Sequence, residues 1–110
     1  MPNVFKVQTS EDFSKKVIQS TVPVLVDFHA DWCGPCRALG PRLEAKVNGR
    51  GGRILLAKVN VDSAAEIAAD YGINAVPTIF AFKNGKKVAS FSGVLDDKQL
   101  DEFIDKVINA

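Results

Sequence analysis

The sequence predicts an α/β domain with helices on both faces of a mixed β-sheet. Two segments rich in β-branched and apolar residues, 24–28 and 54–61, are typical of strands that are covered on both faces. A segment with helical spacing lies between them, so we expect a right-handed βαβ unit with parallel strands. Asn84-Gly85 separates two further strand-like segments and predicts an antiparallel hairpin, which makes the sheet mixed.

The first half of the chain is expected to contain two strands and two helices. Residues 4–7 form a short strand, and residues 9–12 have the Ser/Thr-x-x-acid form of a capping box that starts a helix. The strand at 24–28 is the central one. The next helix carries Pro41 in its interior, where proline removes a hydrogen bond and is expected to kink the helix. Its apolar face comprises Leu39, Leu43 and Val47.

The second half begins with the strand at 54–61. Asp62-Ser63 is expected to cap a short helix over 64–71 that is closed by Gly72. The hairpin strands follow on either side of Asn84-Gly85. A last helix starts at a capping box and brings the total to five strands and four helices. This capping box comprises Asp96 and Gln99, and the apolar stripe of the helix comprises Leu100, Phe103, Ile104, Val107 and Ile108.

The composition is that of one ordinary globular domain spanning residues 1–110. Hydrophobic residues make up 46% of the chain and charged residues 25%, which argues against a disordered chain. Fourteen Lys and Arg residues against thirteen Asp and Glu residues leave a net charge of +1. No global field therefore attracts nucleic acid or an anionic membrane, and no apolar stretch approaches the ~20 residues of a membrane span. We expect a monomer.

The chain has only two cysteines, Cys33 and Cys36, and one histidine, His29. These residues cannot supply the four nitrogen and sulfur ligands of a structural zinc site, so we expect no metal. A disulfide between residues three apart closes a very short loop and constrains the unfolded chain little, which makes a purely structural bridge a weak explanation. A redox pair explains the spacing better than two inert cysteines do.

The position of Cys33 predicts a nucleophile. A strand ends and a helix begins there, so free backbone N–H groups and the helix dipole stabilise its thiolate. Cys36 follows one turn later on the same face, where we expect it to be less exposed and to resolve a mixed disulfide. Gly34 and Pro35 fill the first turn, where the fixed φ of proline limits motion of the pair. Cys33 would attack a substrate disulfide, and Cys36 would release the reduced substrate.

A carboxylate inside an apolar strand is the second unusual feature. Burial of Asp27 raises its pKa and favours the neutral acid, which could exchange a proton with Cys36. The alternative is a structural acid, linked to water or paired to Lys58 on the neighbouring strand. His29 shares a strand face with Asp27 and would allow a Cys-His nucleophile, but such an enzyme needs one cysteine and this chain has two. A packed, hydrogen-bonded histidine is the simpler interpretation.

Pro77 is expected at the first residue of a strand, where it interrupts pairing and leaves backbone groups free. Proline permits a cis bond at this position. If Pro77 faces the cysteines, the backbone of Val76 could hold an extended substrate by strand addition; a plain turn proline is the alternative. Gly93 follows the last strand and allows close backbone approach.

The chain resembles the thioredoxin family over essentially its whole length, and Trp-Cys-Gly-Pro-Cys followed at this distance by Val-Pro-Thr is highly specific. The resemblance implies the thioredoxin fold, an α/β fold with a central mixed five-stranded sheet flanked by four helices. The matching residues are Val26-Asp27-Phe28, Ala30, Trp32-Cys33-Gly34-Pro35-Cys36, Pro41, Lys58, Asp62, Val76-Pro77-Thr78, Asn84-Gly85 and Gly93.

The resemblance also implies residue roles. Cys33 is the nucleophile, Cys36 the resolving thiol and Asp27 the buried acid linked to deprotonation of Cys36, with Lys58 tuning that acid. Gly34 and Pro35 tune the pair. The apolar substrate surface around the sulfur comprises Trp32, Gly34, Pro35, Val76, cis-Pro77 and Gly93.

By resemblance, the function is that of a protein disulfide reductase and electron carrier in cell redox homeostasis. A flavoprotein thioredoxin reductase that draws on NADPH would recharge it, so the chain itself would bind no cofactor. Peroxiredoxins and methionine sulfoxide reductases are the expected clients. Two alternatives remain. An oxidase or isomerase is disfavoured by Gly-Pro between the cysteines, and a redox-gated binding module would need neither a buried acid nor a resolving thiol.

The segments around the site are similar to mitochondrial thioredoxins. Many thioredoxins carry tryptophan or another apolar residue where this chain has His29, and residues 39–44 also match the mitochondrial type. We therefore expect a mature protein of the mitochondrial matrix whose precursor carries a transit segment that is not in this sequence. The cytoplasm is the alternative.

Overall fold

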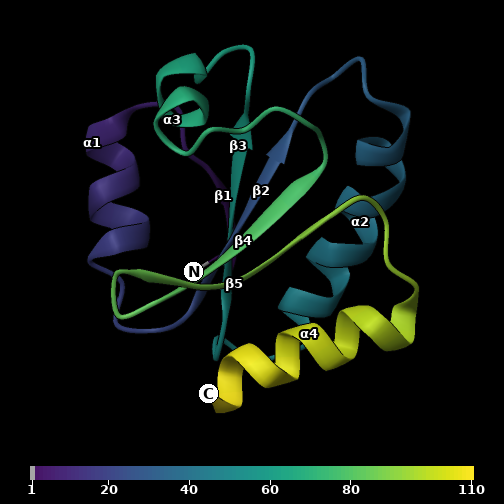
Figure 1. The fold of residues 1–110 in the computed structure, drawn as a ribbon. Helices are drawn as coiled ribbons and strands as arrows, with labels where there is room; N and C mark the ends of the chain where they lie inside the picture. Colours follow the sequence, from purple (N-terminus) through teal and green to yellow (C-terminus); the bar gives the residue numbers. More distant parts are fainter. Residues whose placement is uncertain (1) are drawn as a thin grey trace.

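The computed structural model describes residues 2–110, and its centre is a five-stranded sheet in the order β1-β3-β2-β4-β5 (Figure 1). The parallel pairs β1–β3 and β2–β3 and the antiparallel pairs β2–β4 and β4–β5 confirm the predicted mixed sheet. The strands are β1 (Val4–Lys6), β2 (Val24–His29), β3 (Leu55–Asn60), β4 (Thr78–Lys83) and β5 (Lys86–Ser92).

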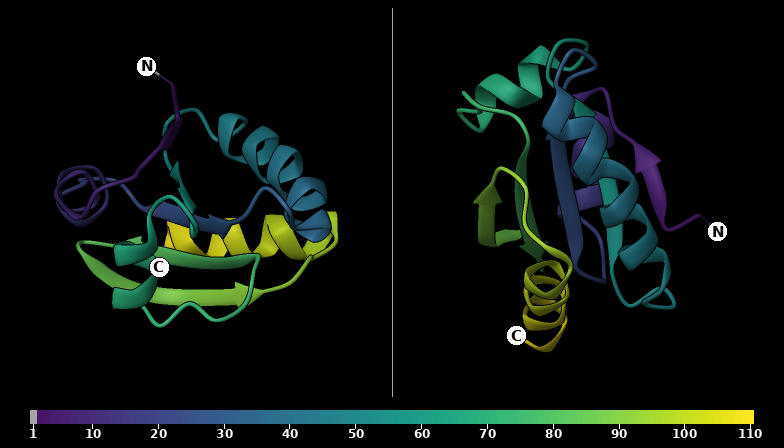
Figure 2. Two further views of the ribbon diagram at one scale, coloured as in Figure 1. Left: turned by 90° about the horizontal axis from the view of Figure 1, so that it is seen from above. Right: turned by 90° about the vertical axis from the view of Figure 1, so that its right-hand side faces the viewer.

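Helices cover both faces of this sheet, as predicted (Figure 2). On one face, α1, η1 and α3 pack over β2 through an apolar cluster that includes Phe13 and Phe28. On the other face, α2 and α4 pack through a second cluster that includes Leu39 and Leu100. The helical segments are α1 (Ser10–Phe13), η1 (Ser14–Ile18), α2 (Gly34–Asn48), α3 (Ala65–Asp70) and α4 (Asp97–Asn109).

Side-chain alternation along β2 decides which residues face α2. Val24, Val26 and Phe28 belong to the cluster under α1 and α3, whereas Leu25 belongs to the cluster under α2 and α4. Because successive strand residues point to opposite faces, Asp27 points toward the α2 side with Leu25. The central strand thus carries its one carboxylate to the face on which the cysteine helix packs.

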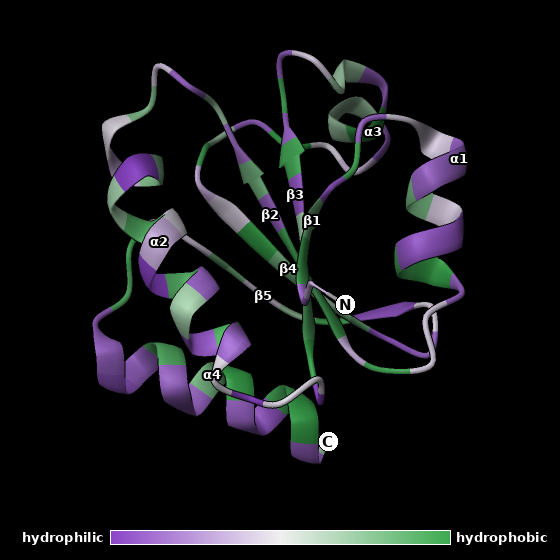
Figure 3. Cartoon of the chain, turned by 180° about the vertical axis from the view of Figure 1, so that it is seen from behind, coloured by the Kyte–Doolittle hydropathy of each residue, from purple (hydrophilic) through white to green (hydrophobic). Residues whose placement is uncertain are grey.

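Several local predictions are confirmed. Asn84 and Gly85 have φ of 54° and 78°, as the hairpin turn requires. The α4 capping box is present in both directions, and Thr9 accepts a hydrogen bond from the Asp12 N–H at the start of α1. Hydrophobic bands alternate with hydrophilic ones along α4 (Figure 3), as the predicted apolar stripe requires.

The predicted first helix is present, and after Phe13 it continues as the π-helix η1, a hydrogen-bond pattern that apolar spacing does not specify. One local prediction is wrong. Asp62-Ser63 does not cap α3. Its N-cap is Ala64, without a side-chain hydrogen bond, while the side chain of Asn60 accepts from the backbone N–H groups of Asp62 and Ser63.

An ion-pair ladder joins α2 to α4. Basic residues four apart, Arg42 and Lys46 on α2 and Arg50 in the turn that follows it, meet acidic residues four apart on α4, so the two helices lie side by side. The pairs are Arg42–Asp97 at 3.0 Å, Lys46–Asp101 at 3.0 Å, Arg50–Asp101 at 3.0 Å and Arg50–Asp105 at 3.1 Å. The ladder links the helix that carries both cysteines to the C-terminal helix.

Candidate active site

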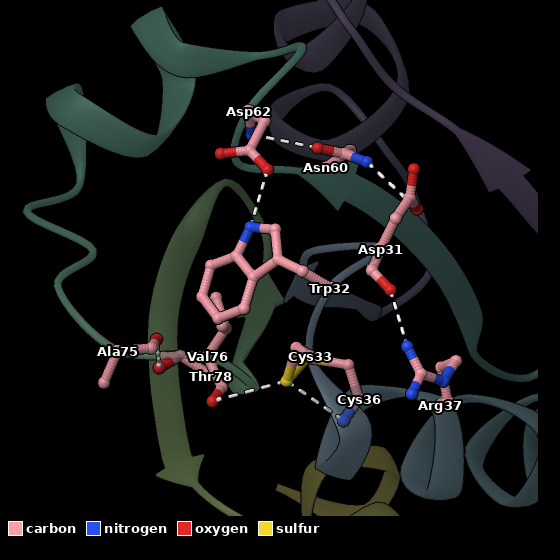
Figure 4. The surroundings of a disulfide bond; sticks show 10 residues. All are labelled: Asp31, Trp32, Cys33, Cys36, Arg37, Asn60, Asp62, Ala75, Val76 and Thr78. Atoms are coloured by element: carbon pink, nitrogen blue, oxygen red, sulfur yellow. Dashed lines mark hydrogen bonds between the residues drawn. A yellow bond between two sulfur atoms is a disulfide. The ribbon is translucent and has the colours of Figure 1, made fainter.

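The two cysteines lie where β2 passes into α2 (Figure 4). Cys33 is the N-cap of α2, with extended backbone angles (φ −90°, ψ 111°), and Pro35 lies in the first turn. A disulfide joins Cys33 to Cys36 with the Cα atoms 5.3 Å apart. The predicted position of the pair at a strand-to-helix junction is therefore confirmed.

Backbone groups surround the sulfur of Cys33. The Cys36 N–H donates a hydrogen bond to Cys33 Sγ at 3.2 Å, and the Val76 carbonyl oxygen lies 3.7 Å from the same sulfur. In the reduced protein this N–H and the positive helix end would favour the thiolate of Cys33. The geometry therefore suits Cys33 to be the attacking sulfur.

The expected difference in exposure between the cysteines is absent. Cys33 is 5% exposed and Cys36 6% exposed. Cys33 is more covered than a helix N-terminus implies because it packs with Ala30 and against Val76. Val76 is far from Cys33 in sequence, so the motif does not encode this contact.

Val76 packs against the cysteine pair with its carbonyl oxygen at Cys33 Sγ, and the bond from Val76 to Pro77 is cis. The Gly93 N–H donates to the Pro77 carbonyl at 3.0 Å, and Gly93 has φ of 84°, a conformation that glycine adopts without a Cβ clash. The structure thus brings Val76, Pro77 and Gly93 together beside Cys33.

Trp32 is the most exposed large apolar side chain beside the cysteines, at 69%. Its indole N–H donates to Asp62 Oδ2 at 2.9 Å, and Asn60 joins Asp62 to Asp31 through further hydrogen bonds (Figure 4). Asp62 therefore anchors Trp32 instead of capping α3. Since β2 and β3 are parallel neighbours, the segments that follow their carboxyl ends meet at one edge of the sheet. The predicted parallel pair could therefore have suggested the contact between Trp32 and Asp62.

Asp27 is buried, at 2% exposed, and its Oδ1 has no hydrogen-bond partner among the described residues. Burial raises its pKa from the ordinary 3.8 to about 6, with the Lys58 cation opposing the rise and the Glu44 carboxylate adding to it. The predicted direction is confirmed. Asp27 can therefore gain or lose a proton near neutral pH.

Lys58 does not pair with Asp27. The two residues are register partners on β2 and β3, yet the Lys58 ammonium lies 2.7 Å from Glu44 Oε2 on α2. No hydrogen bond joins Lys58 to Asp27 among residues 2–110. The alternative in which Asp27 is a structural acid paired to Lys58 is therefore wrong. Sequence reasoning missed Glu44, although Cys36, Gly40 and Glu44 are spaced four apart and therefore share a helix face.

A cavity of about 380 Å³ connects these groups. Asp27, Cys36, Glu44 and Lys58 all line it, so the buried acid and the second cysteine face one space that is large enough for several water molecules. A proton could move between Asp27 and Cys36 through such water. The sequence placed these two residues together, and the structure gives them a shared cavity.

His29 lines the same cavity but does not form a Cys-His pair. Burial and the nearby Lys58 cation lower its pKa below the ordinary 6.5, so it is mainly neutral at pH 7. No hydrogen bond joins His29 to Cys33 or Cys36 among residues 2–110. The hydrolase interpretation therefore gains nothing from the structure.

Comparison with known proteins decides the family. The thioredoxin family model matches residues 4–106. This chain belongs to the thioredoxin family. It is 69% identical to probable thioredoxin-2 of Caenorhabditis elegans over 98% of this chain and 74% of that one, and 48% identical to mitochondrial thioredoxin of Mus musculus over 94% and 63%. The chain thus spans less than two thirds of the mouse protein.

A solved structure agrees with this assignment. The thioredoxin of Malassezia sympodialis superposes with a TM-score of 0.85 at 34% identity, covering 96% of this chain and 90% of that one. The predicted thioredoxin fold is therefore confirmed. Together with the Cys33–Cys36 pair, family membership identifies this thioredoxin as a thiol-disulfide oxidoreductase.

Other classes of site have no support in the part of the chain that the structure describes. Within residues 2–110, no three His, Cys, Asp or Glu side chains are arranged to hold a metal ion. None of the helices found there is both long and apolar enough to span a bilayer.

Proposed function

We propose that this thioredoxin reduces disulfides of client proteins, with Cys33 as nucleophile and Cys36 as resolving thiol. The observation that carries the proposal is the hydrogen bond from the Cys36 N–H to Cys33 Sγ at the first turn of α2. This contact favours the thiolate of Cys33, whereas Cys36 lies one turn inside the helix and faces the cavity of Asp27.

The reaction is two successive thiol-disulfide exchanges. The Cys33 thiolate attacks the client disulfide, a Cys33–client disulfide forms, and the first client sulfur leaves as a thiolate that takes up a proton. The Cys36 thiolate then attacks Cys33 Sγ, and the second client sulfur leaves. Two electrons pass from the cysteine pair to the client, and the pair ends as the disulfide.

Asp27 is proposed as the proton acceptor for Cys36 in the second exchange. A thiol attacks only after it has lost its proton, and Asp27 shares a cavity with Cys36. The pKa of about 6 leaves Asp27 mostly ionised at pH 7, yet able to hold a proton briefly. Lys58 moderates this pKa through its positive charge.

The surface around Cys33 is proposed to bind the client chain. Trp32 supplies an exposed apolar face, and the backbone of Val76 offers an extended client strand hydrogen-bonding groups next to the sulfur. Pro77 and Gly93 shape the same edge through their backbone hydrogen bond. Gly34 and Pro35 are exposed in the first turn of α2 and complete this surface.

We further propose that thioredoxin reductase recharges the chain with electrons from NADPH, and that peroxiredoxins and methionine sulfoxide reductases are among its clients. Family membership supports disulfide-containing client proteins in general. The mitochondrial thioredoxins of mouse, rat and cattle, at 47–48% identity, support a place in the mitochondrial matrix, with the cytoplasm as the alternative. We also propose that the protein acts as a monomer.

The test is reduction of insulin by dithiothreitol, followed as turbidity, with wild type and Cys33→Ser side by side. Acceleration by the wild type alone supports the proposal. Absence of acceleration by either protein contradicts it and favours a redox-gated binding module. The reduction potential of the cysteine pair then separates a reductase from an oxidase or isomerase, because an oxidase has a much higher potential.

A further inference from the structure

We propose that Glu44 is a positioning residue: its carboxylate holds the Lys58 ammonium away from Asp27 and so keeps Asp27 able to carry a proton. The proposal rests on the proposed function of Asp27 for its catalytic consequence. The contact itself, 2.7 Å between Lys58 Nζ and Glu44 Oε2, is a feature of the structure. Glu44 is hydrogen-bonded to Lys58, and it acts on Asp27 by holding this ammonium as well as through its own negative charge.

The Lys58 ammonium could pair with either of two carboxylates, Asp27 or Glu44. Lys58 and Asp27 are register partners on adjacent parallel strands, which lie about 4.8 Å apart. Lys58 faces α2 with Leu56, and Asp27 faces it with Leu25, so both side chains lie on the same side of the sheet. The long side chain of Lys58 could therefore reach Asp27 if nothing else held it.

Glu44 supplies the competing partner from α2. It lies two turns after Cys36 on the same helix face, and Gly40 between them has no side chain to separate α2 from the ion pair. A Cβ at Gly40 would lie 3.8 Å from Lys58 Nζ, which shows how closely the ammonium approaches the helix backbone. The Lys58 ammonium therefore lies against α2, where Glu44 binds it.

The charged and titratable groups around Asp27 are few. Within the described chain, the other such groups that line its cavity are His29 on β2, Asp31 in the following loop, Lys58 on β3, and Cys36, Arg37 and Glu44 on α2. Lys58 is the cation whose charge lowers the pKa of Asp27, and Glu44 raises it. Loss of the Glu44 charge would therefore lower the pKa of Asp27 twice, by removing a nearby anion and by freeing Lys58 to approach.

The experiment is an NMR titration of the Asp27 carboxyl carbon in the oxidised protein, where neither cysteine titrates. The variants are Glu44→Gln, Lys58→Met and the double variant, with Glu102→Gln, an exposed glutamate on α4, as the matched control. We expect Glu44→Gln to lower the Asp27 midpoint by about one pH unit, because an opposite charge within 4–6 Å lowers a carboxyl pKa by about 1–3. Glu102→Gln leaves the midpoint unchanged.

The double variant separates positioning from simple charge. In the Lys58→Met background there is no ammonium to release, so Glu44→Gln should shift the midpoint by less than half as much as in wild type. Glu44→Asp keeps the charge on a shorter side chain and should restore most of the wild-type midpoint. Equal shifts in both backgrounds, or no shift in either, would overturn the proposal.

The pH profile of insulin reduction tests the consequence for turnover. If Asp27 serves Cys36, the acid limb of the Glu44→Gln profile should move to lower pH together with the NMR midpoint. A midpoint that moves while the rate profile stays fixed would support the positioning by Glu44 and contradict the proposed role of Asp27. The two hypotheses therefore fail separately.

Discussion

Replacing Asp27 by asparagine should change how the stability of the protein depends on pH. The carboxyl pKa is raised to about 6 in the folded protein, whereas an unfolded chain has the ordinary 3.8. The folded state therefore holds this proton more tightly than the unfolded state does. The stability that Asp27 contributes is fully present below about pH 3.8, is lost as the pH rises to about 6, and does not change further above that pH.

The size of the effect follows from the two pKa values. Their difference corresponds to about 3 kcal/mol in the free energy of unfolding. Asparagine does not ionise, so Asp27→Asn avoids this loss. Between pH 3.8 and pH 6 the free energy of unfolding of the variant should rise by about 3 kcal/mol relative to that of wild type. A constant offset caused by the amide does not change this rise.

Urea denaturation of the oxidised proteins, followed by far-ultraviolet circular dichroism from pH 3.5 to pH 8, measures this difference. Other groups that titrate in this range, such as His29, are common to both proteins and cancel in the comparison. Asp70→Asn, at an exposed position on α3, is the matched control and should show no such trend. A wild-type-to-variant difference that stays constant with pH would refute the reasoning.

Three other substitutions probe the thiol chemistry, the tryptophan anchor and the ion pairs between α2 and α4. Cys36→Ser removes the resolving thiol and should accumulate a mixed disulfide with clients on non-reducing gels; recovery of none would count against Cys36 as that group. Asp62→Ala removes the acceptor of the Trp32 indole and should raise the KM for insulin by about fivefold, since one hydrogen bond contributes about 1 kcal/mol. Asp62→Asn keeps an acceptor and serves as the control. An unchanged KM in Asp62→Ala would contradict the role of Asp62 in holding Trp32. Asp101→Asn takes a partner from Lys46 on α2 and from Arg50 just after it, and should lower the urea midpoint at low salt but not near 1 M salt, where the Debye length is about 3 Å; a salt-independent loss would exclude the electrostatic explanation.

The features that were predictable from sequence are those set by local chemistry. Asn84-Gly85 needs two positive φ angles and has them, and Cys33 lies at a helix start because a strand pattern stops before it and a helix pattern follows. The burial of Asp27 followed from its apolar neighbours on the strand. In each case a short stretch of chain contains the whole physical reason.

The features that were missed depend on how distant segments meet. Lys58 has two carboxylates within reach, and its choice of Glu44 depends on the placement of α2 over β3, which no local pattern encodes. The near-equal exposure of the cysteines likewise depends on Val76, which follows Cys36 by forty residues along the chain. The sequence predicts Asp62 as a cap of the nearest helix, whereas its side chain accepts from Trp32 across the parallel strand pair.

Stability and activity should respond in opposite directions at Asp27. A carboxylate that served the fold would be hydrogen-bonded on both oxygens, whereas Asp27 Oδ1 has no such partner among the described residues and its ionised form is unfavourable where it lies. The proposed proton transfer to and from Cys36 is a reason to keep it there. The free energy of unfolding of Asp27→Asn minus that of wild type should therefore be larger above pH 6 than at pH 3.5. Above pH 6 the variant should also reduce insulin more slowly than wild type. A variant that is stabilised in this way but turns over at the wild-type rate would leave Asp27 without a function in the reaction.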